Sequence, residues 1–84
     1  MKLKLLYFAS LAEDLGRQEE TLEIHNAAQL SDLRQHLAQR GENWATYILN
    51  AQRTLAAVNQ TMARDDAELH DGDEVAFFPP VSGG

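Results

Sequence analysis

Apolar and polar residues alternate at the start of the chain. Leu3, Leu5 and Tyr7 occupy every second position of residues 2–7, the spacing that places side chains on one face of a half-buried strand. Residues 21–24 alternate in the same way and predict a second strand, antiparallel to the first. Between these strands, residues 8–15 predict a short helix that Gly16 closes.

The middle of the chain changes to a helical period. Leu30, Leu33 and Leu37 follow the i, i+3, i+7 spacing of one apolar stripe. Arg40 and Gly41 fit the last turn and the position after it. These residues predict the main helix of the molecule.

Two segments on either side of the main helix are less regular: the start of the helix has two interpretations, and residues 44–49 follow no clear period. Asn26 with Gln29 three residues later resembles a capping box, but Gln29 could itself precede the helix as a poor cap. Residues 44–49 are apolar and compact, and they predict one irregular turn packed on the core.

The last third of the chain predicts two more strands. Residues 55–58 are small and apolar, as a central strand can be, and residues 59–61 predict a turn. Residues 71–73 predict a turn into residues 74–78, whose β-branched and aromatic side chains favour a strand. The prolines of residues 79–80 must end sheet pairing, because proline has no N–H to donate.

This order of elements indicates the α+β class. Strands from both ends of the chain, with one main helix between them, predict a small sheet with the helix across one face. The 84 residues suit one domain. We therefore expect a globular body over residues 1–78 and an extended tail over residues 79–84.

Composition and motifs exclude several kinds of chemistry. The chain has no cysteine, a net charge of −6, and only seven scattered Lys and Arg residues, so we expect no nucleic acid partner. We also expect no membrane span and no signal peptide, and hence a cytoplasmic protein. His25, His36 and His70 are too far apart for a metal motif, and the acidic residues 65–74 lack calcium-loop spacing. We expect no bound metal, and neither a nucleophile elbow nor a phosphate-binding loop is present.

The tail and one aromatic residue are therefore the strongest functional candidates. Gly83 and Gly84 form a thin backbone that can pass through a narrow slot, and the α-carboxylate of Gly84 is the reactive group there. If Val75 and Phe77 fill the core, Phe78 lies on the outer face beside the tail. There it can anchor a partner protein, in a patch that Met62, Leu11 and Phe8 extend.

The chain resembles the small, sulfur-carrying subunits of molybdopterin synthase, ubiquitin-like proteins of the β-grasp fold. The resemblance covers essentially the whole chain. It is carried by Ala56-Ala57-Val58-Asn59-Gln60 and by Asp71-Gly72-Asp73-Glu74-Val75-Ala76-Phe77-Phe78-Pro79-Pro80-Val81-Ser82-Gly83-Gly84. The chain departs from the family at Gln29, where Thr or Ser is common, and at Ala12, where some members have a basic residue.

The resemblance implies a mechanism at Gly84. A separate adenylating enzyme, which uses ATP and Mg²⁺, converts the carboxylate to an acyl-adenylate, and a sulfur donor displaces AMP to leave a thiocarboxylate. The tail, formed by Pro79, Pro80, Val81, Ser82, Gly83 and Gly84, then enters the large subunit of the synthase. There two sulfur transfers to cyclic pyranopterin monophosphate build the dithiolene. The expected assembly is a heterotetramer of two small and two large subunits, and the small subunit binds no cofactor alone.

Other functions with a Gly-Gly end stay open. The chain could be a related sulfur carrier for thiamine synthesis or tRNA thiolation. It could instead be a ubiquitin-like modifier that Gly84 joins to target lysines, or an interaction module with an inert tail.

Overall fold

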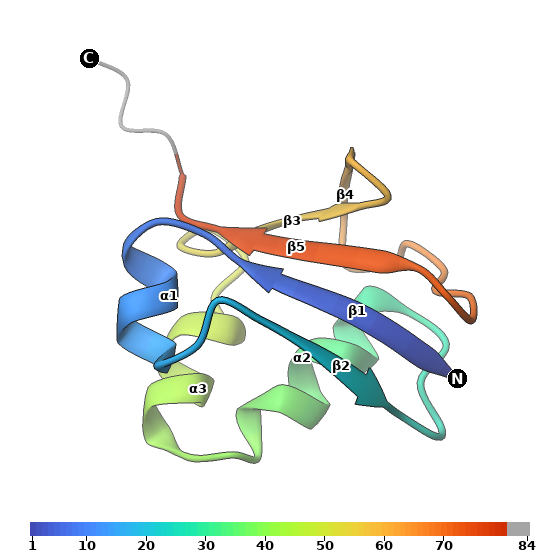
Figure 1. Cartoon of the computed structure of the whole chain (residues 1–84), viewed down its shortest axis with the longest axis horizontal. Coiled ribbons are helices and arrows are strands. Elements are labelled where there is room, and N and C mark those ends of the chain that lie inside the picture. The colour runs from blue at the N-terminus through green and yellow to red at the C-terminus, as the bar shows by residue number, and fades with distance from the viewer. Residues whose placement is uncertain (81–84) are drawn as a thin grey trace.

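The computed structural model describes residues 1–80, and five strands in it form one mixed sheet in the order β2-β1-β5-β3-β4 (Figure 1). At its centre, β1 (Lys2–Tyr7) and β5 (Glu74–Phe78) run parallel. On one side, β2 (Glu19–Glu23) pairs antiparallel with β1. On the other, β3 (Leu55–Val58) pairs antiparallel with β5 and carries β4 (Thr61–Ala63) at the edge.

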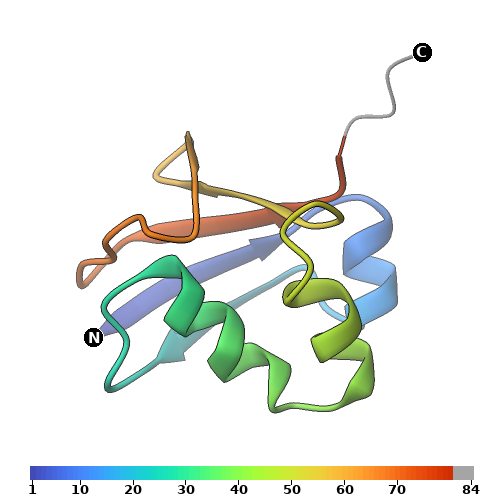
Figure 2. The same cartoon turned by 180° about the vertical axis from the view of Figure 1, so that it is seen from behind.

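The three helices lie together on one side of this sheet. They are α1 (Ser10–Leu15), α2 (Leu30–Ala38) and α3 (Glu42–Ile48) (Figures 1 and 2). The inward side chains of the central strands are almost fully buried, with Leu5, Val75 and Phe77 each at 0% exposure. The leucine stripe of α2 covers them, and its Leu30, Leu33 and Leu37 are also at 0%. Within residues 1–80, no helix lies on the opposite face.

Much of the predicted architecture is confirmed. The chain has the α+β class and the β-grasp arrangement, and the strands over residues 2–7 and 74–78 have the predicted bounds. The second strand is antiparallel to the first, as predicted, although it begins at Glu19. Gly16 ends α1 in the left-handed conformation, with φ of 77°.

The start of α2 follows the second of the two interpretations. Gln29 is the N-cap, and its side chain accepts from the backbone of Asp32 while the Asp32 carboxylate accepts from the N–H of Gln29. A poor cap thus works because an acidic residue at the third helical position completes the capping box. The helix ends at Ala38 with Gln39 as its C-cap, so the prediction that it continues to Arg40 is wrong.

Residues 44–49 are not an irregular turn, which corrects the sequence-based prediction. Residues 44–48 belong to α3, in which Trp44, Tyr47 and Ile48 follow an i, i+3, i+4 spacing, and Leu49 is its C-cap. Ile48 is fully buried, while Trp44 and Tyr47 pack against the core. Packing stabilises this short helix, whose own sequence is weak in helix formers.

In the hairpin β3–β4, the strand over residues 55–58 is confirmed, and the partner strand β4 was not predicted. Asn59 and Gln60 both have positive φ, 51° and 69°, as in the two-residue turns that match strand twist. The Asn59 side chain donates to Asp73 Oδ1 over 2.9 Å and accepts from the N–H of Glu74 over 3.0 Å. These bonds tie the turn to the start of β5 and make a left-handed Asn favourable there.

Candidate functional site

The tail leaves the body from the centre of the sheet. β5 ends at Phe78, beside α1 and at the end of the molecule opposite to the N-terminus (Figure 1). The N–H of Phe8 donates to the carbonyl of Phe77 over 3.0 Å, one position past the β1–β5 pairing. The base of the tail, where Pro79 is partly buried and Pro80 exposed, is therefore fixed by two central strands. The predicted tail residues Val81, Ser82, Gly83 and Gly84 lie outside the described residues.

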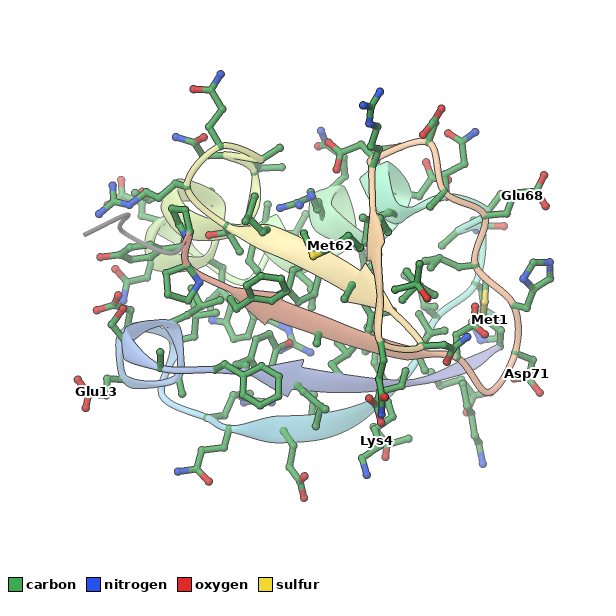
Figure 3. The ribbon with its side chains drawn as sticks, turned by 90° about the horizontal axis from the view of Figure 1, so that it is seen from above. Met1, Lys4, Glu13, Met62, Glu68 and Asp71 are labelled. Carbon is green, nitrogen blue, oxygen red and sulfur yellow. The ribbon has the colours of Figure 1, made fainter. Side chains whose placement is uncertain are left out.

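The outer face of the sheet gathers the predicted anchor residues. Phe8 is 48% exposed and Met62 is 61% exposed, while Phe78 is half-buried. The register Leu55↔Phe78 and Ala57↔Met62 places Phe78 and Met62 on the face without helices, and Phe8 directly follows the inward-facing Tyr7. Figure 3 looks onto this face and shows Met62 above the sheet.

Small apolar residues connect the anchors. Leu6 pairs with Ala76 and Ala76 with Ala57 across the three strands β1, β5 and β3. We call this surface the apolar outer face, and it consists of Leu6, Phe8, Leu55, Ala57, Met62, Ala76 and Phe78. The small residues cannot be recognised in the sequence alone, because their outward positions on three neighbouring strands follow only from the order of the strands in the sheet.

Leu11 does not belong to this surface. Its side chain is 2% exposed and packs in the core from α1. The expectation of an exposed Leu11 is therefore corrected, because residue 11 faces inward once the helix begins at Ser10.

A network of charged and aromatic side chains contacts the end of β1 on the side of the sheet that carries the helices. The Tyr7 hydroxyl donates to Glu20 Oε2 over 2.8 Å, and Arg40 donates to both Glu20 oxygens over 2.6 and 2.7 Å. Arg17 adds an ion pair to Glu20 at 3.2 Å. The Arg40 guanidinium also lies 4.6 Å from the centre of the Trp44 ring. This network joins β1 and β2 to the segment between α2 and α3, which no local sequence pattern could show.

The same network shifts the pKa values of Glu20, Tyr7 and Arg40, and the hydrogen bond to Glu20 is the main cause that raises the pKa of Arg40. Partial burial alone would raise the pKa of Glu20, but the hydrogen bonds from Arg40 and Tyr7 outweigh burial and hold the pKa below its ordinary value. Burial first, and then the hydrogen bond to Glu20, raise the pKa of Tyr7. Tyr7 is thus a neutral donor and Glu20 a charged acceptor at neutral pH.

Replacing Glu20 should make stability less dependent on pH. The folded-state pKa of Glu20 lies below its ordinary value of 4.5. The stability that the charged Glu20 carboxylate contributes is therefore fully present above pH 4.5 and is lost as the pH falls through the folded-state pKa. We expect Glu20→Gln to lower the free energy of unfolding at pH 7 by about 1 kcal/mol. The difference from wild type should shrink below pH 4.5. Urea unfolding at a series of pH values measures the free energy of unfolding of wild type and Glu20→Gln, and the exposed Glu19→Gln is the control. A difference between wild type and Glu20→Gln that stays constant at all pH values would contradict the lowered pKa of Glu20.

Other kinds of site find no support in the described part of the chain. Residues 1–80 contain no group of three or more His, Asp or Glu side chains placed to hold a metal ion. No helix among them has the length and apolar character needed to cross a membrane. The candidate site consists of the fixed tail base and the apolar outer face.

Comparison with known proteins agrees with this geometry. The model of the ThiS family matches residues 5–84. The molybdopterin synthase sulfur carrier subunit of Escherichia coli is 45% identical over 82 residues, covering 98% of this chain and 99% of that protein. The crystal structure of SAMP1 from Haloferax volcanii superposes with a TM-score of 0.82 at 25% identity, over the full length of both chains. A chain from the complex of subunits 1 and 2 of the Helicobacter pylori molybdopterin-converting factor shares the fold, with a TM-score of 0.68 at 24% identity and full coverage of both.

Proposed function

This chain belongs to the ThiS family, and we propose that it is the sulfur carrier subunit of a molybdopterin synthase. The observation that carries the proposal is its likeness to the sulfur carrier subunit of Escherichia coli, at 45% identity over almost the whole of both chains. The fixed tail base and the apolar outer face are the features that such a carrier requires. It must deliver the end of its main chain into another protein and hold its body against that protein.

The chemistry of the proposal takes place at Gly84. A carboxylate is a poor electrophile, because its charge is delocalised and its leaving group would be oxide. An oxygen of Gly84 therefore attacks the α-phosphorus of ATP on an adenylating enzyme, which needs Mg²⁺, and pyrophosphate leaves. A sulfur donor then attacks the acyl carbon and AMP leaves, so that a C–S bond replaces a C–O bond. Since the chain has no cysteine, the sulfur is held on the main chain.

The thiocarboxylate sulfur is the nucleophile of the second half of the reaction. It attacks the cyclic pyranopterin monophosphate precursor inside the large subunit, and hydrolysis returns the Gly84 carboxylate. Two such transfers supply both sulfurs of the dithiolene. The chain is thus one part of a sulfurtransferase and is not catalytic alone.

The residues at the base of the tail have roles in this delivery. Residues 79–84 span roughly 20 Å when extended, long enough for Gly84 to reach a buried pocket while the body stays outside. Pro79 and Pro80 hold φ near −65°, which lowers the entropy lost on threading. Gly83 and Gly84 then pass the narrowest part.

The partners follow from the same proposal. The large subunit of the synthase covers the apolar outer face, with Phe8, Met62 and Phe78 as the main contacts, and two small and two large subunits form a heterotetramer. An adenylyltransferase resembling ubiquitin-activating enzymes binds the chain in the activation step.

A reconstituted reaction tests the function. We expect the thiocarboxylated chain, mixed with the large subunit and cyclic pyranopterin monophosphate, to form molybdopterin in a ratio of two carriers per product. The carboxylate form of the chain is the control and should form none. A thiocarboxylated chain that binds the large subunit and leaves the precursor unchanged would exclude the proposal.

A ubiquitin-like modifier is the second candidate. It is favoured by the superposition on SAMP1, small archaeal modifier protein 1, at 25% identity. In that case Gly84 would form isopeptide bonds with lysines, and the same activation mixture would yield adducts of higher mass instead of a free thiocarboxylate. Related carriers for thiamine synthesis or tRNA thiolation would form the thiocarboxylate but fail in the reconstituted reaction.

A further inference from the structure

A small recess lies where the tail leaves the body. Its volume is about 90 Å³, room for one carboxylate group or a few water molecules. Three separate segments form it: α1, the end of α3 with the loop after it, and the residue that follows β5. We call it the tail-base recess, and its lining includes Ser10, Asp14, Tyr47, Arg53, Thr54 and Pro79.

The local backbone holds Arg53 at this recess. The carbonyl of Asn50 accepts from the N–H groups of Arg53 and Thr54 over 3.0 and 2.8 Å, and its side-chain oxygen accepts from Gln52 and Arg53. The Arg53 guanidinium lies 4.6 Å from the centre of the Tyr47 ring. A stacked arginine on a fixed turn is pre-organised, so it loses little entropy when it binds a partner.

Arg53 is one of four basic residues without an ion pair among residues 1–80, the others being Lys2, Lys4 and Arg64. Three of the seven basic residues, Arg17, Arg34 and Arg40, form ion pairs with carboxylates. Within residues 1–80, no ion pair involves Arg53, although Asp14 lines the same recess. The exposed guanidinium is therefore available to a group from outside.

The rest of the lining favours a hydrogen-bond acceptor. Ser10, Tyr47 and Thr54, which line the recess together with Arg53, carry hydroxyl groups. Thr54 is 1% exposed, and in the described part of the chain its Oγ1 has no hydrogen-bond partner. A carboxylate offers about four acceptor positions and matches the planar fork of arginine.

We propose that Arg53 docks a carboxylate that the large subunit presents beside the entrance to its tail-binding channel. The proposal rests on the proposed function, because the protein that takes in the tail at Pro79 must bring the rim of its channel against the tail-base recess. On a chain with net charge −6, an incoming carboxylate is attracted where a positive charge has no carboxylate partner, as at Arg53. The contact thus sets the orientation in which the tail enters.

Charge reversal at Arg53 tests the contact. With the large subunit from the same organism as the probe, we expect Arg53→Glu to weaken the complex on the order of tenfold or more. Asp14→Asn should tighten it, because it removes the carboxylate that faces the incoming one. Lys2→Glu is the matched control. It makes the same charge change at the start of β1, at the end of the molecule opposite to the base of the tail, and should leave the affinity unchanged (Figure 1).

The outcomes separate this contact from the function itself. Wild-type binding with equal affinities for Arg53→Glu and Lys2→Glu would overturn the contact and leave the function intact. Weakened binding to the adenylating enzyme alone would likewise overturn the assignment to the large subunit. Absence of wild-type binding would contradict both the contact and the proposed function. Circular dichroism melting of each variant checks that a lost affinity is not lost folding.

Discussion

Removal of Gly84 should abolish molybdopterin formation and leave the fold unchanged. The shortened chain still ends in a glycine carboxylate, but its reactive atom stops one residue, about 3.3 Å, short of the adenylation centre and the precursor. Misplacement of a reacting group by even an ångström can cost on the order of a hundredfold in rate. We therefore expect a loss of at least three orders of magnitude, which the reconstituted reaction measures.

A one-residue extension is the opposite change. An alanine added after Gly84 moves the carboxylate outward and puts a side chain where the narrow channel admits none, so activity should also be lost. Both variants should melt at the wild-type temperature, because the described core is formed by side chains between Met1 and Phe77. Retained activity in either variant would show that the reactive group is elsewhere. Replacement of the exposed Gln60, in the turn between β3 and β4, is the control and should change neither the activity nor the melting temperature.

Replacement of Phe78 by Asp should weaken the complex with the large subunit at least a hundredfold. Phe78 is the half-buried aromatic residue of the apolar outer face and directly precedes the tail. Central aromatic residues of interfaces commonly contribute 2 kcal/mol or more, and a buried unpaired carboxylate adds a desolvation cost. Isothermal titration with the large subunit measures the change.

Two further variants keep this result interpretable if Phe78→Asp folds poorly. Met62 is 61% exposed, so Met62→Asp changes the same face with little effect on folding and should also weaken binding. Thr21→Asp places the same charge on β2 outside the apolar outer face and should bind as wild type. Equal binding by Met62→Asp and Thr21→Asp would exclude this face as the interface.

The sequence predicted the parts of the fold that depend on strong local periodicity. The strands over residues 2–7 and 74–78 and the leucine stripe of α2 are confirmed, because alternation and helical spacing determine which side faces the core. The hairpin partner β4 was missed, since its three residues form a strand only through pairing with β3. In the same way, α3 depends on burial of Ile48 more than on helix propensity.

The candidate site was predictable only in part. Phe78 on the outer face follows from the parity of its strand, and exposure of Phe8 and Met62 is confirmed. Leu11 was misplaced because the start of α1 decides which way residue 11 faces. The Glu20 network and the tail-base recess join residues far apart in the chain, and only the folded arrangement brings them together.

The intact mass of the chain after activation tests the central claim most directly. The protein is incubated with its adenylating enzyme, ATP, Mg²⁺ and a sulfur donor, and then weighed by mass spectrometry. We predict a gain equal to the difference between one sulfur and one oxygen atom, located by fragmentation at Gly84 and absent when ATP is omitted. An unchanged mass with the active enzyme, or adducts on lysines in place of the sulfur, would contradict the account.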